Sequence, residues 1–200
     1  MYRIWVDEQP LDSVLPMLSG VAEIVGPGAD LRELSLCDGA LDPGARWDAA
    51  RMDRAGRLQV ISRIGVGYDN IDVAAATARG IQVCYTPHGP TISTAEHAIA
   101  LIFAAAKTVC YADRDVRAGR WHRAFRTVKG MELRGRVLGL VGAGRIGSEV
   151  ARVMQAVGMR VLVYDPGLSE ERARQAGLEW VSSLELLVSA ADVVALHAPS

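Results

Sequence analysis

The sequence contains little cysteine. Its three cysteines, Cys37, Cys84 and Cys110, are widely spaced and odd in number, and they form no CxxC or Cys/His cluster. This pattern argues against a disulfide framework and against a structural zinc site. We therefore expect no bound metal and a reducing, cytoplasmic compartment.

Long hydrophobic runs and an excess of either charge are also missing. The longest apolar run, residues 98–106, has nine residues, too few to cross a bilayer, and the first residues lack the pattern of a signal peptide. The 22 basic and 23 acidic residues leave a net charge of −1, so no global field attracts phosphate backbones or anionic lipid. We expect no nucleic-acid and no membrane partner.

The chain is rich in apolar residues, which make up half of it, and only 22% of its residues are charged. This is the composition of a folded globular protein. Short apolar runs alternate with helical patterns along the first half, which predicts an α/β fold with a parallel sheet covered by helices. The runs lie at residues 2–6, 14–18, 23–25, 36–41, 49–55, 58–61, 71–78 and 81–85.

Capping residues predict two helix starts. Asp69 or Asn70 would cap a helix that stops at Gly80, a residue suited to the left-handed position after a helix. Ser93 and Glu96 fit a capping box, which would open a long helix over residues 94–118. This helix is the predicted entry to a second domain, with residues 1–96 in the first domain and residues 97–200 in the second.

The strongest chemical signal is a glycine-rich turn. A strand pattern over residues 136–141 leads directly into Gly142-Ala143-Gly144-Arg145-Ile146-Gly147, and a helix pattern follows. A second strand ends at Asp165, 23 positions after Gly142. A strand, a GxGxxG turn, a helix and a later acidic residue in this order are typical of a dinucleotide-binding unit.

Each residue of this pattern has a physical role. Gly142 permits the tight turn, Gly144 leaves room for a pyrophosphate, and Gly147 lets the helix pack closely on the strand. The Asp165 carboxylate would accept hydrogen bonds from ribose hydroxyls and repel a 2′-phosphate, which favours NAD over NADP. A third strand over residues 192–197 would complete a βαβαβ unit.

A second signal is the sequence Gly65-Val66-Gly67, which follows the strand at residues 58–61. Backbone N–H groups in such a turn could hold an anion such as a carboxylate. The alternative is a plain strand-to-helix turn in which Asp69 or Asn70 only caps the helix.

Taken together, these motifs resemble the D-isomer-specific 2-hydroxyacid dehydrogenase family, which includes phosphoglycerate dehydrogenases and glyoxylate or hydroxypyruvate reductases. The matching motifs extend over essentially the whole chain, at residues 65–72, 94–98, 116–121, 133–147 and 196–199. The resemblance implies that residues 1–96 are the N-terminal portion of a flavodoxin-like substrate domain. Residues 97–200 would be the first βαβαβ half of a Rossmann NAD-binding domain, with the active site in the cleft between the domains.

The resemblance also implies residue roles. The backbone at Gly65, Val66 and Gly67 would hold the carboxylate of a 2-hydroxy or 2-oxo acid, with Val66 near the nicotinamide. NAD would be bound by Gly142, Gly144, Arg145, Ile146, Gly147, Asp165, Ala198 and Pro199. The complete protein would be a homodimer that transfers a hydride between the substrate and NAD.

In this family an arginine, a glutamate and a histidine carry the chemistry, and all three follow the third strand of the Rossmann half. We therefore expect no catalytic residue in these 200 residues and no activity of the chain alone. The four histidines, His88, His97, His122 and His197, are assigned structural or surface roles. The chain is interpreted as the N-terminal part of such a dehydrogenase.

Two alternatives remain open at this point. One is a non-catalytic, NAD-responsive interaction module similar to corepressors of the C-terminal-binding-protein type, and the other is a structural relic without a ligand. The sequence also predicts that the central strand, residues 137–141, has no partner on one side, which would make an isolated monomer unstable.

Overall fold

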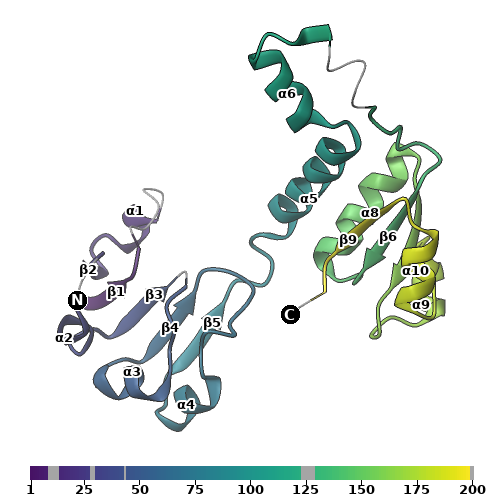
Figure 1. The fold of residues 1–200 in the computed structure, drawn as a ribbon. Helices are drawn as coiled ribbons and strands as arrows, with labels where there is room; N and C mark the ends of the chain where they lie inside the picture. The colour runs from purple at the N-terminus through teal and green to yellow at the C-terminus, as the bar shows by residue number, and fades with distance from the viewer. Residues whose placement is uncertain (9–13, 28–29, 43, 123–128, 199–200) are drawn as a thin grey trace. The chain divides into compact units, whose positions relative to one another are not determined.

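The structure, a computed structural model, describes residues 1–8, 14–27, 30–42, 44–122 and 129–198 (Figure 1). The chain divides into two compact units, Met1–Pro90 (unit 1) and Thr91–Ser200 (unit 2). Each unit has its own hydrophobic core. The expected division into functional domains at residues 96 and 97 stays a prediction.

Unit 1 is a parallel sheet with helices between its strands. The strand order is β2-β1-β3-β4-β5, and every neighbouring pair is parallel. Its strands are β1 (Tyr2–Val6), β2 (Ala22–Val25), β3 (Gly39–Asp42), β4 (Val60–Arg63) and β5 (Gln82–Tyr85). Its helices are α1 (Leu15–Leu18), α2 (Leu31–Leu34), α3 (Ala49–Arg54) and α4 (Val73–Ala78).

One face of this sheet forms the core of unit 1. Trp5, Ala40 and Ile61 are buried and lie opposite one another in register across β1, β3 and β4. Residues in register on neighbouring strands point to the same face of a sheet. Buried side chains of the helices cover this row, among them Leu34 of α2 and Met52 of α3. The short runs of the sequence are thus the strands and helices of an α/β layer.

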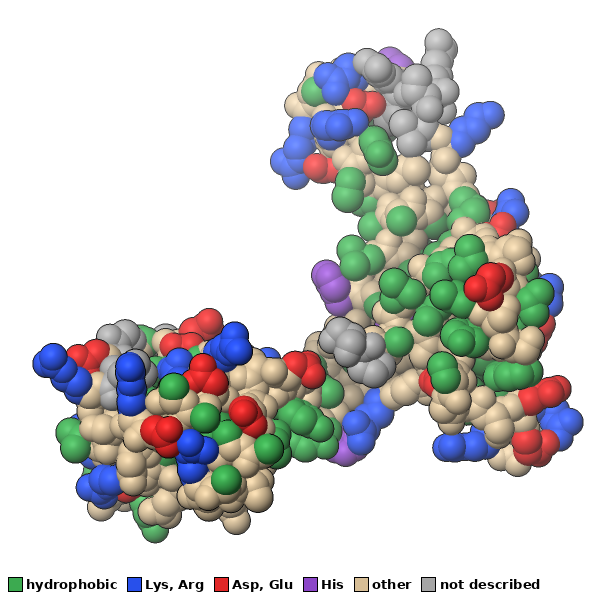
Figure 2. Space-filling model, turned by 60° about the horizontal axis from the view of Figure 1, so that its bottom comes forward, with side chains coloured by type: hydrophobic (Ala, Val, Ile, Leu, Met, Phe, Trp, Pro, Cys, Tyr) green, Lys and Arg blue, Asp and Glu red, His purple; other side chains and the backbone are tan. Residues whose placement is uncertain are grey.

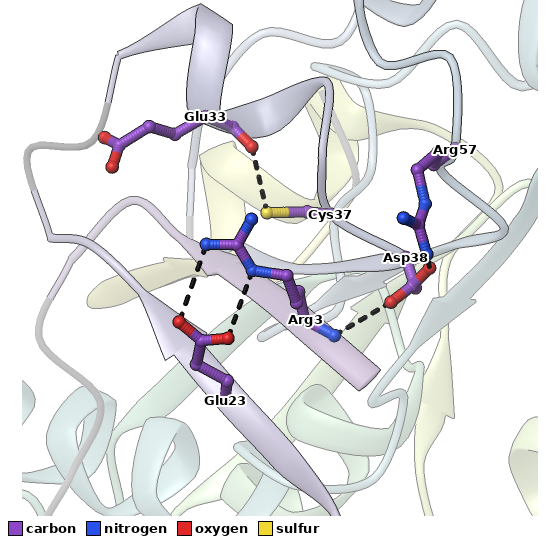
Figure 3. A network of polar contacts seen from close by, with 6 residues as sticks. All are labelled: Arg3, Glu23, Glu33, Cys37, Asp38 and Arg57. Carbon is purple, nitrogen blue, oxygen red and sulfur yellow. Dashed lines mark hydrogen bonds and ion pairs between the residues drawn. The ribbon is translucent and has the colours of Figure 1, made fainter. Parts of the chain in front are cut away.

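A polar network ties the beginnings of the strands together (Figure 3). The Asp38 carboxylate, just before β3, accepts hydrogen bonds from Arg3 N at 2.9 Å and from the Arg57 guanidinium at 2.8 Å. Two hydrogen bonds lower the pKa of Asp38. The larger effect comes from the backbone N–H of Arg3, and the next from the side chain of Arg57. Arg3 also pairs with Glu23 of β2 at 3.2 Å, so three strands are held in register at this end.

A buried carboxylate organises the loop after β3. Asp42 is fully buried, and its Oδ1 accepts hydrogen bonds from Gly44 N at 3.0 Å and Ala45 N at 2.8 Å. Its Oδ2 accepts one from Trp47 Nε1 at 2.6 Å. These donors therefore replace the water that the carboxylate would otherwise need.

Unit 2 is a second parallel sheet, with the order β8-β7-β6-β9. Its strands are β6 (Val137–Val141), β7 (Arg160–Tyr164), β8 (Glu179–Trp180) and β9 (Val193–Leu196). Its helices are α5 (Thr91–Ala106), α6 (Val109–Arg117), α8 (Arg145–Val157), α9 (Glu170–Gln175) and α10 (Leu184–Ala190).

Helices cover both faces of this second sheet (Figure 1). Leu138 and Leu140 of β6 point into a core shared with Val150 and Met154 of α8 and with one side of α5. On the other face, α10 packs so closely on β6 that a side chain at Gly139 would lie 2.5 Å from Leu187 Cδ2. An α/β layer with helices on both faces is the doubly wound arrangement.

The strand order corrects the expectation of an unpaired side of β6. β9 pairs with β6 along Leu138–Val141, on the side opposite β7. The reason is that the two-residue strand β8 takes the third place, beside β7, so β9 is the fourth strand of the sheet. The predicted third strand, residues 192–197, is thus present as β9, but it is the fourth strand of unit 2, because β8 comes before it in the chain.

The two edges of this sheet lie at β8 and β9, and not at β6. Large hydrophobic side chains on β9 and α10 are exposed, and Figure 2 shows hydrophobic side chains gathered on one face of unit 2. These exposed residues are Leu184, Leu186, Val188, Val194 and Leu196.

The single long helix predicted over residues 94–118 is wrong, because the structure contains two helices, α5 and α6, with a 64° bend between them. Thr108 adopts a left-handed conformation with φ +53°, which ends the helical path. The carbonyl of Ala106 accepts a hydrogen bond from Met131 N at 2.6 Å, so the end of α5 is fixed by the returning chain. Among the described residues no single helix has the length and apolar content of a membrane span, and only this bent pair reaches both.

Both predicted helix starts are also corrected. Helix α5 begins at Thr91, so Ser93 lies inside the helix and not at its cap. Helix α4 is capped by Asp72, whose carboxylate accepts a hydrogen bond from Ala75 N at 2.8 Å. Asn70 instead donates from its side chain to Ala45 O and fastens the loop after β3.

The buried Asp42 generates a stability prediction. We expect Asp42→Ala to lower the free energy of unfolding of unit 1 by about 3 kcal/mol, because three donors lose a buried partner. The control Asp53→Ala, which removes an exposed ion pair with Arg79, should cost about 0.5 kcal/mol. Urea unfolding of both variants measures the difference, and equal losses would contradict the role given to Asp42.

Candidate nucleotide-binding and anion-binding sites

The glycine-rich turn of unit 2 connects β6 to α8 at the carboxyl end of the sheet. Gly142 has φ +91°, a conformation that favours glycine, and a side chain there would lie 2.8 Å from the backbone nitrogen of Ala198. A side chain at Gly147 would overlap the carbonyl oxygen of Gly142. Two of the three glycines are therefore required by close backbone packing.

Gly144 has a different surrounding. It is the N-cap of α8, and no atom of the described residues lies within 4 Å of the place that a Cβ would occupy. The protein itself does not require glycine here, so the empty space suits a group that approaches the backbone from outside. This is the role that the sequence assigned to Gly144.

The beginning of α8 offers free donors. Within the part of the chain that the structure describes, the N–H groups of Arg145, Ile146 and Gly147 have no hydrogen-bond acceptor, and no side chain caps the helix. Free N–H groups and the positive end of a 13-residue helix favour a phosphate group. The Arg145 side chain is exposed at this end, whereas Ile146 packs on the core of unit 2.

Asp165 lies beside this turn, directly after β7. Its Oδ2 accepts a hydrogen bond from Ala143 N at 2.8 Å, and its Oδ1 accepts one from Gly167 N at 2.8 Å. The carboxylate is thus fixed against the glycine-rich turn and is half-buried. The remaining lone pairs can accept hydrogen bonds from ribose hydroxyls, so the residues present fit a dinucleotide.

The end of β9 reaches the same place. Ala198 borders Gly142, as the close approach of its nitrogen demonstrates, and Pro199 lies outside the described residues. His197 is half-buried, and its Nε2 has no hydrogen-bond partner among the described residues. Burial lowers the pKa of His197, so its neutral form is favoured.

A second loop with free donors follows β4 in unit 1. Gly65 has φ +143°, and its N–H already donates to Thr86 Oγ1 at 2.9 Å. The N–H groups of Val66 and Gly67 have no acceptor in the described ranges. Of the three residues predicted to hold a carboxylate, only Val66 and Gly67 therefore have a backbone donor free for it.

Two residues outside Gly65–Gly67, Arg63 and Thr86, contact this loop, and the sequence pattern does not predict that they shape it. Their sequence signal is their position. Arg63 ends β4 and Thr86 follows β5, and the carboxyl ends of these adjacent parallel strands meet at one edge of the sheet. Within the described residues no group of three or more His, Cys, Asp or Glu side chains could hold a metal ion.

Three features together define a dinucleotide-binding α/β unit. They are a turn without room for side chains, free N–H groups at the start of a helix, and an acidic residue after the second strand. A family model described as "D-isomer specific 2-hydroxyacid dehydrogenase, NAD binding domain" matches residues 99–200, just over half of the chain. The chain belongs to this family, and NAD is the cofactor of its second unit. The family, the fold class and the cofactor expected from the sequence are confirmed.

Curated relatives agree with this assignment. The chain is 49% identical over 152 residues to D-3-phosphoglycerate dehydrogenase of Archaeoglobus fulgidus, covering 76% of this chain and 28% of the relative. It is 46% identical over 154 residues to glyoxylate reductase of Korarchaeum cryptofilum, covering 76% of this chain and 46% of the relative. The chain thus spans less than half the length of either relative.

Solved structures share this fold. A protein of Thermus thermophilus is similar with a TM-score of 0.88 and 35% identity, covering 99% of this chain and 65% of that one. The pyruvate reductase of Chlamydomonas reinhardtii is similar with a TM-score of 0.81 and 28% identity, covering 99% of this chain and 61% of that one.

The different surroundings of Gly144 and Gly147 lead to a paired prediction. Gly144→Ala meets no protein atom and should leave the melting temperature unchanged, while NADH affinity falls about tenfold or more because the new methyl group obstructs the pyrophosphate. Gly147→Ala should lower both the melting temperature and the affinity. Thermal melts and NADH titrations of the two variants separate ligand contact from packing. An undiminished affinity of Gly144→Ala would contradict the proposed pyrophosphate position.

His197 predicts a pH dependence of stability. The unfolded imidazole binds its proton near pH 6.5 and the folded one at a lower pH. As pH falls below about 6.5, protonation therefore stabilises the unfolded state first, and unit 2 loses stability until the folded pKa is passed. We expect the loss between about pH 7.5 and about pH 5.5 to be smaller in His197→Gln. Urea unfolding at both pH values measures it, with exposed His88→Gln as control. Equal losses in the wild type and His197→Gln would contradict the prediction.

Proposed function

We propose that the protein to which this chain belongs is an NAD-dependent oxidoreductase acting on the CH–OH group of a D-2-hydroxy acid. The hydroxyl carbon gives a hydride to NAD⁺ and the hydroxyl group loses a proton, so the products are a 2-oxo acid, NADH and H⁺. The observation that carries the proposal is the glycine-rich turn with Asp165 beside it, in a chain that belongs to a dehydrogenase family.

The loop at Gly65–Gly67 supports the substrate class. Two free N–H groups in adjacent residues, Val66 and Gly67, can hold a carboxylate, the group that all 2-hydroxy acids share. The named activities of two relatives, D-3-phosphoglycerate dehydrogenase and glyoxylate reductase, fall within this class. Glyoxylate, hydroxypyruvate and 3-phosphoglycerate are therefore the substrates to test first.

We also propose that the catalytic arginine, glutamate and histidine lie outside these 200 residues, and that the chain alone is inactive. None of the four histidines is assigned to proton transfer. The whole protein is proposed to be a cytoplasmic homodimer that acts on small molecules and binds neither nucleic acid nor membranes.

Nucleotide titration tests the proposal on the chain itself. We expect NADH to change the emission of the four tryptophans in a saturable manner. NADPH should bind more weakly than NADH by a factor of about ten or more, because the Asp165 carboxylate repels a 2′-phosphate. Asp165→Ser should narrow this difference, whereas Glu170→Ser, an exposed carboxylate that begins α9, should preserve it. An equal affinity for both nucleotides in the wild type would contradict the role of Asp165.

An activity assay follows the titration. The 200-residue chain should turn over none of the three substrates above background, and the full-length protein should use at least one of them. Saturable NADH binding without turnover by the full-length protein would favour the alternative, an NAD-responsive interaction module.

A further inference from the structure

Arg63 ends β4, immediately before the loop of Gly65–Gly67, and its side chain is half-buried. Its Nε donates to Gly67 O at 2.9 Å, and its Nη1 donates to Ile64 O at 2.7 Å. One guanidinium group therefore bridges two carbonyl oxygens three residues apart. It closes a ring around Gly65 and Val66.

The first peptide unit of the loop is held from two sides. Its carbonyl, on Ile64, accepts from Arg63, and its N–H, on Gly65, donates to Thr86 Oγ1 at 2.9 Å. In a trans peptide these two groups point in opposite directions. Arg63 and Thr86 thus fix the plane of this unit between them.

The orientation of the next peptide unit follows from Thr86 as well. The carbonyl of Gly65 accepts from Thr86 N at 3.0 Å, so the N–H of Val66, on the opposite side of the same unit, points away from Thr86. The neighbouring N–H of Gly67 also has no acceptor among the described residues. Two adjacent donors are thus left for an anion, and the carbonyls of Gly65 and Gly67 next to them are engaged by Thr86 and Arg63.

The charge of Arg63 is held at the same place. A side chain at Gly65 would lie 3.4 Å from Arg63 Cζ, so the guanidinium packs against the glycine backbone. A cation at this position attracts an anion that approaches the Val66 and Gly67 donors. Arg63 therefore contributes both the shape of the loop and a fixed positive charge behind it.

We propose that Arg63 is a positioning residue for the substrate carboxylate. Its guanidinium holds the loop in the conformation that presents the Val66 and Gly67 N–H groups to a 2-oxo acid. The identity of the anion rests on the proposed function, whereas the loop geometry does not. Lysine cannot replace Arg63 here, because a single ammonium group lacks the planar fork that reaches two carbonyls.

Steady-state kinetics of the full-length protein test this role. In Arg63→Met and in Arg63→Lys we expect the KM for glyoxylate to rise about tenfold, with the NADH dissociation constant unchanged. The matched control is Arg79→Met, since Arg79 also bridges two groups, Asp53 Oδ1 and Ala75 O, but away from the loop. It should keep the wild-type KM. A wild-type KM in Arg63→Lys would overturn the positioning role, because charge alone would then suffice.

Amide hydrogen exchange tests the loop without any substrate. We expect the hydrogen-bonded amides of Gly65 and Thr86, which donate to Thr86 Oγ1 and Gly65 O, to exchange faster in Arg63→Met than in the wild type. Arg63→Lys provides the same comparison if Arg63→Met does not fold. Unchanged exchange in the folded variants would overturn the proposal. A wild-type protein that neither binds NADH nor reduces glyoxylate would contradict the proposed function instead, and the exchange rates would still decide the role of Arg63.

Discussion

The packing of Gly147 on the carbonyl of Gly142 is the constraint on which unit 2 depends. A helix can start this close to the end of β6 only where residue 147 lacks a side chain, because a Cβ at Gly147 would overlap the Gly142 oxygen. The close start buries Val150 and Met154 of α8 against β6 and leaves the first N–H groups of the helix without acceptors among the described residues. Core packing and the nucleotide site therefore result from the same backbone contact.

The part of the site built by this contact could be predicted from the sequence because it is local. The three glycines, the strand before them and the helix after them lie within about twenty residues, and Asp165 follows the next strand. The sequence does not predict β8, because two residues carry no hydrophobic alternation. Without β8, the pattern makes β9 the third strand and predicts that β6 lacks the partner that β9 in fact provides.

The loop of unit 1 was predicted less completely, for a different physical reason. Gly65 and Gly67 suggest a turn that binds an anion, but the groups that orient its peptide planes come from Arg63 and from Thr86, twenty-one residues away from Gly65. Nothing in the residue types shows that the Gly65 N–H is used internally. Likewise α4 is capped by Asp72, the residue directly before it, and not by Asp69 or Asn70. The side chain of Asn70 is engaged with the loop after β3. Side-chain contacts across strands decide these details, and a sequence pattern does not contain them.

Both units have backbone N–H groups without acceptors among the described residues, and they align these donors by different means. In unit 2 a helix of 13 residues aligns the donors and adds the field of its dipole. In unit 1 the free donors lie in a loop ahead of α4, a helix of six residues, so the alignment must come from elsewhere. Arg63 and Thr86 supply it by engaging the carbonyls of Ile64, Gly65 and Gly67. Arg63 also adds a full positive charge where unit 2 has the partial charge of a helix end. The difference matches the ligands that we propose: a pyrophosphate extends over several helix N–H groups, whereas a single carboxylate needs two donors and a nearby charge.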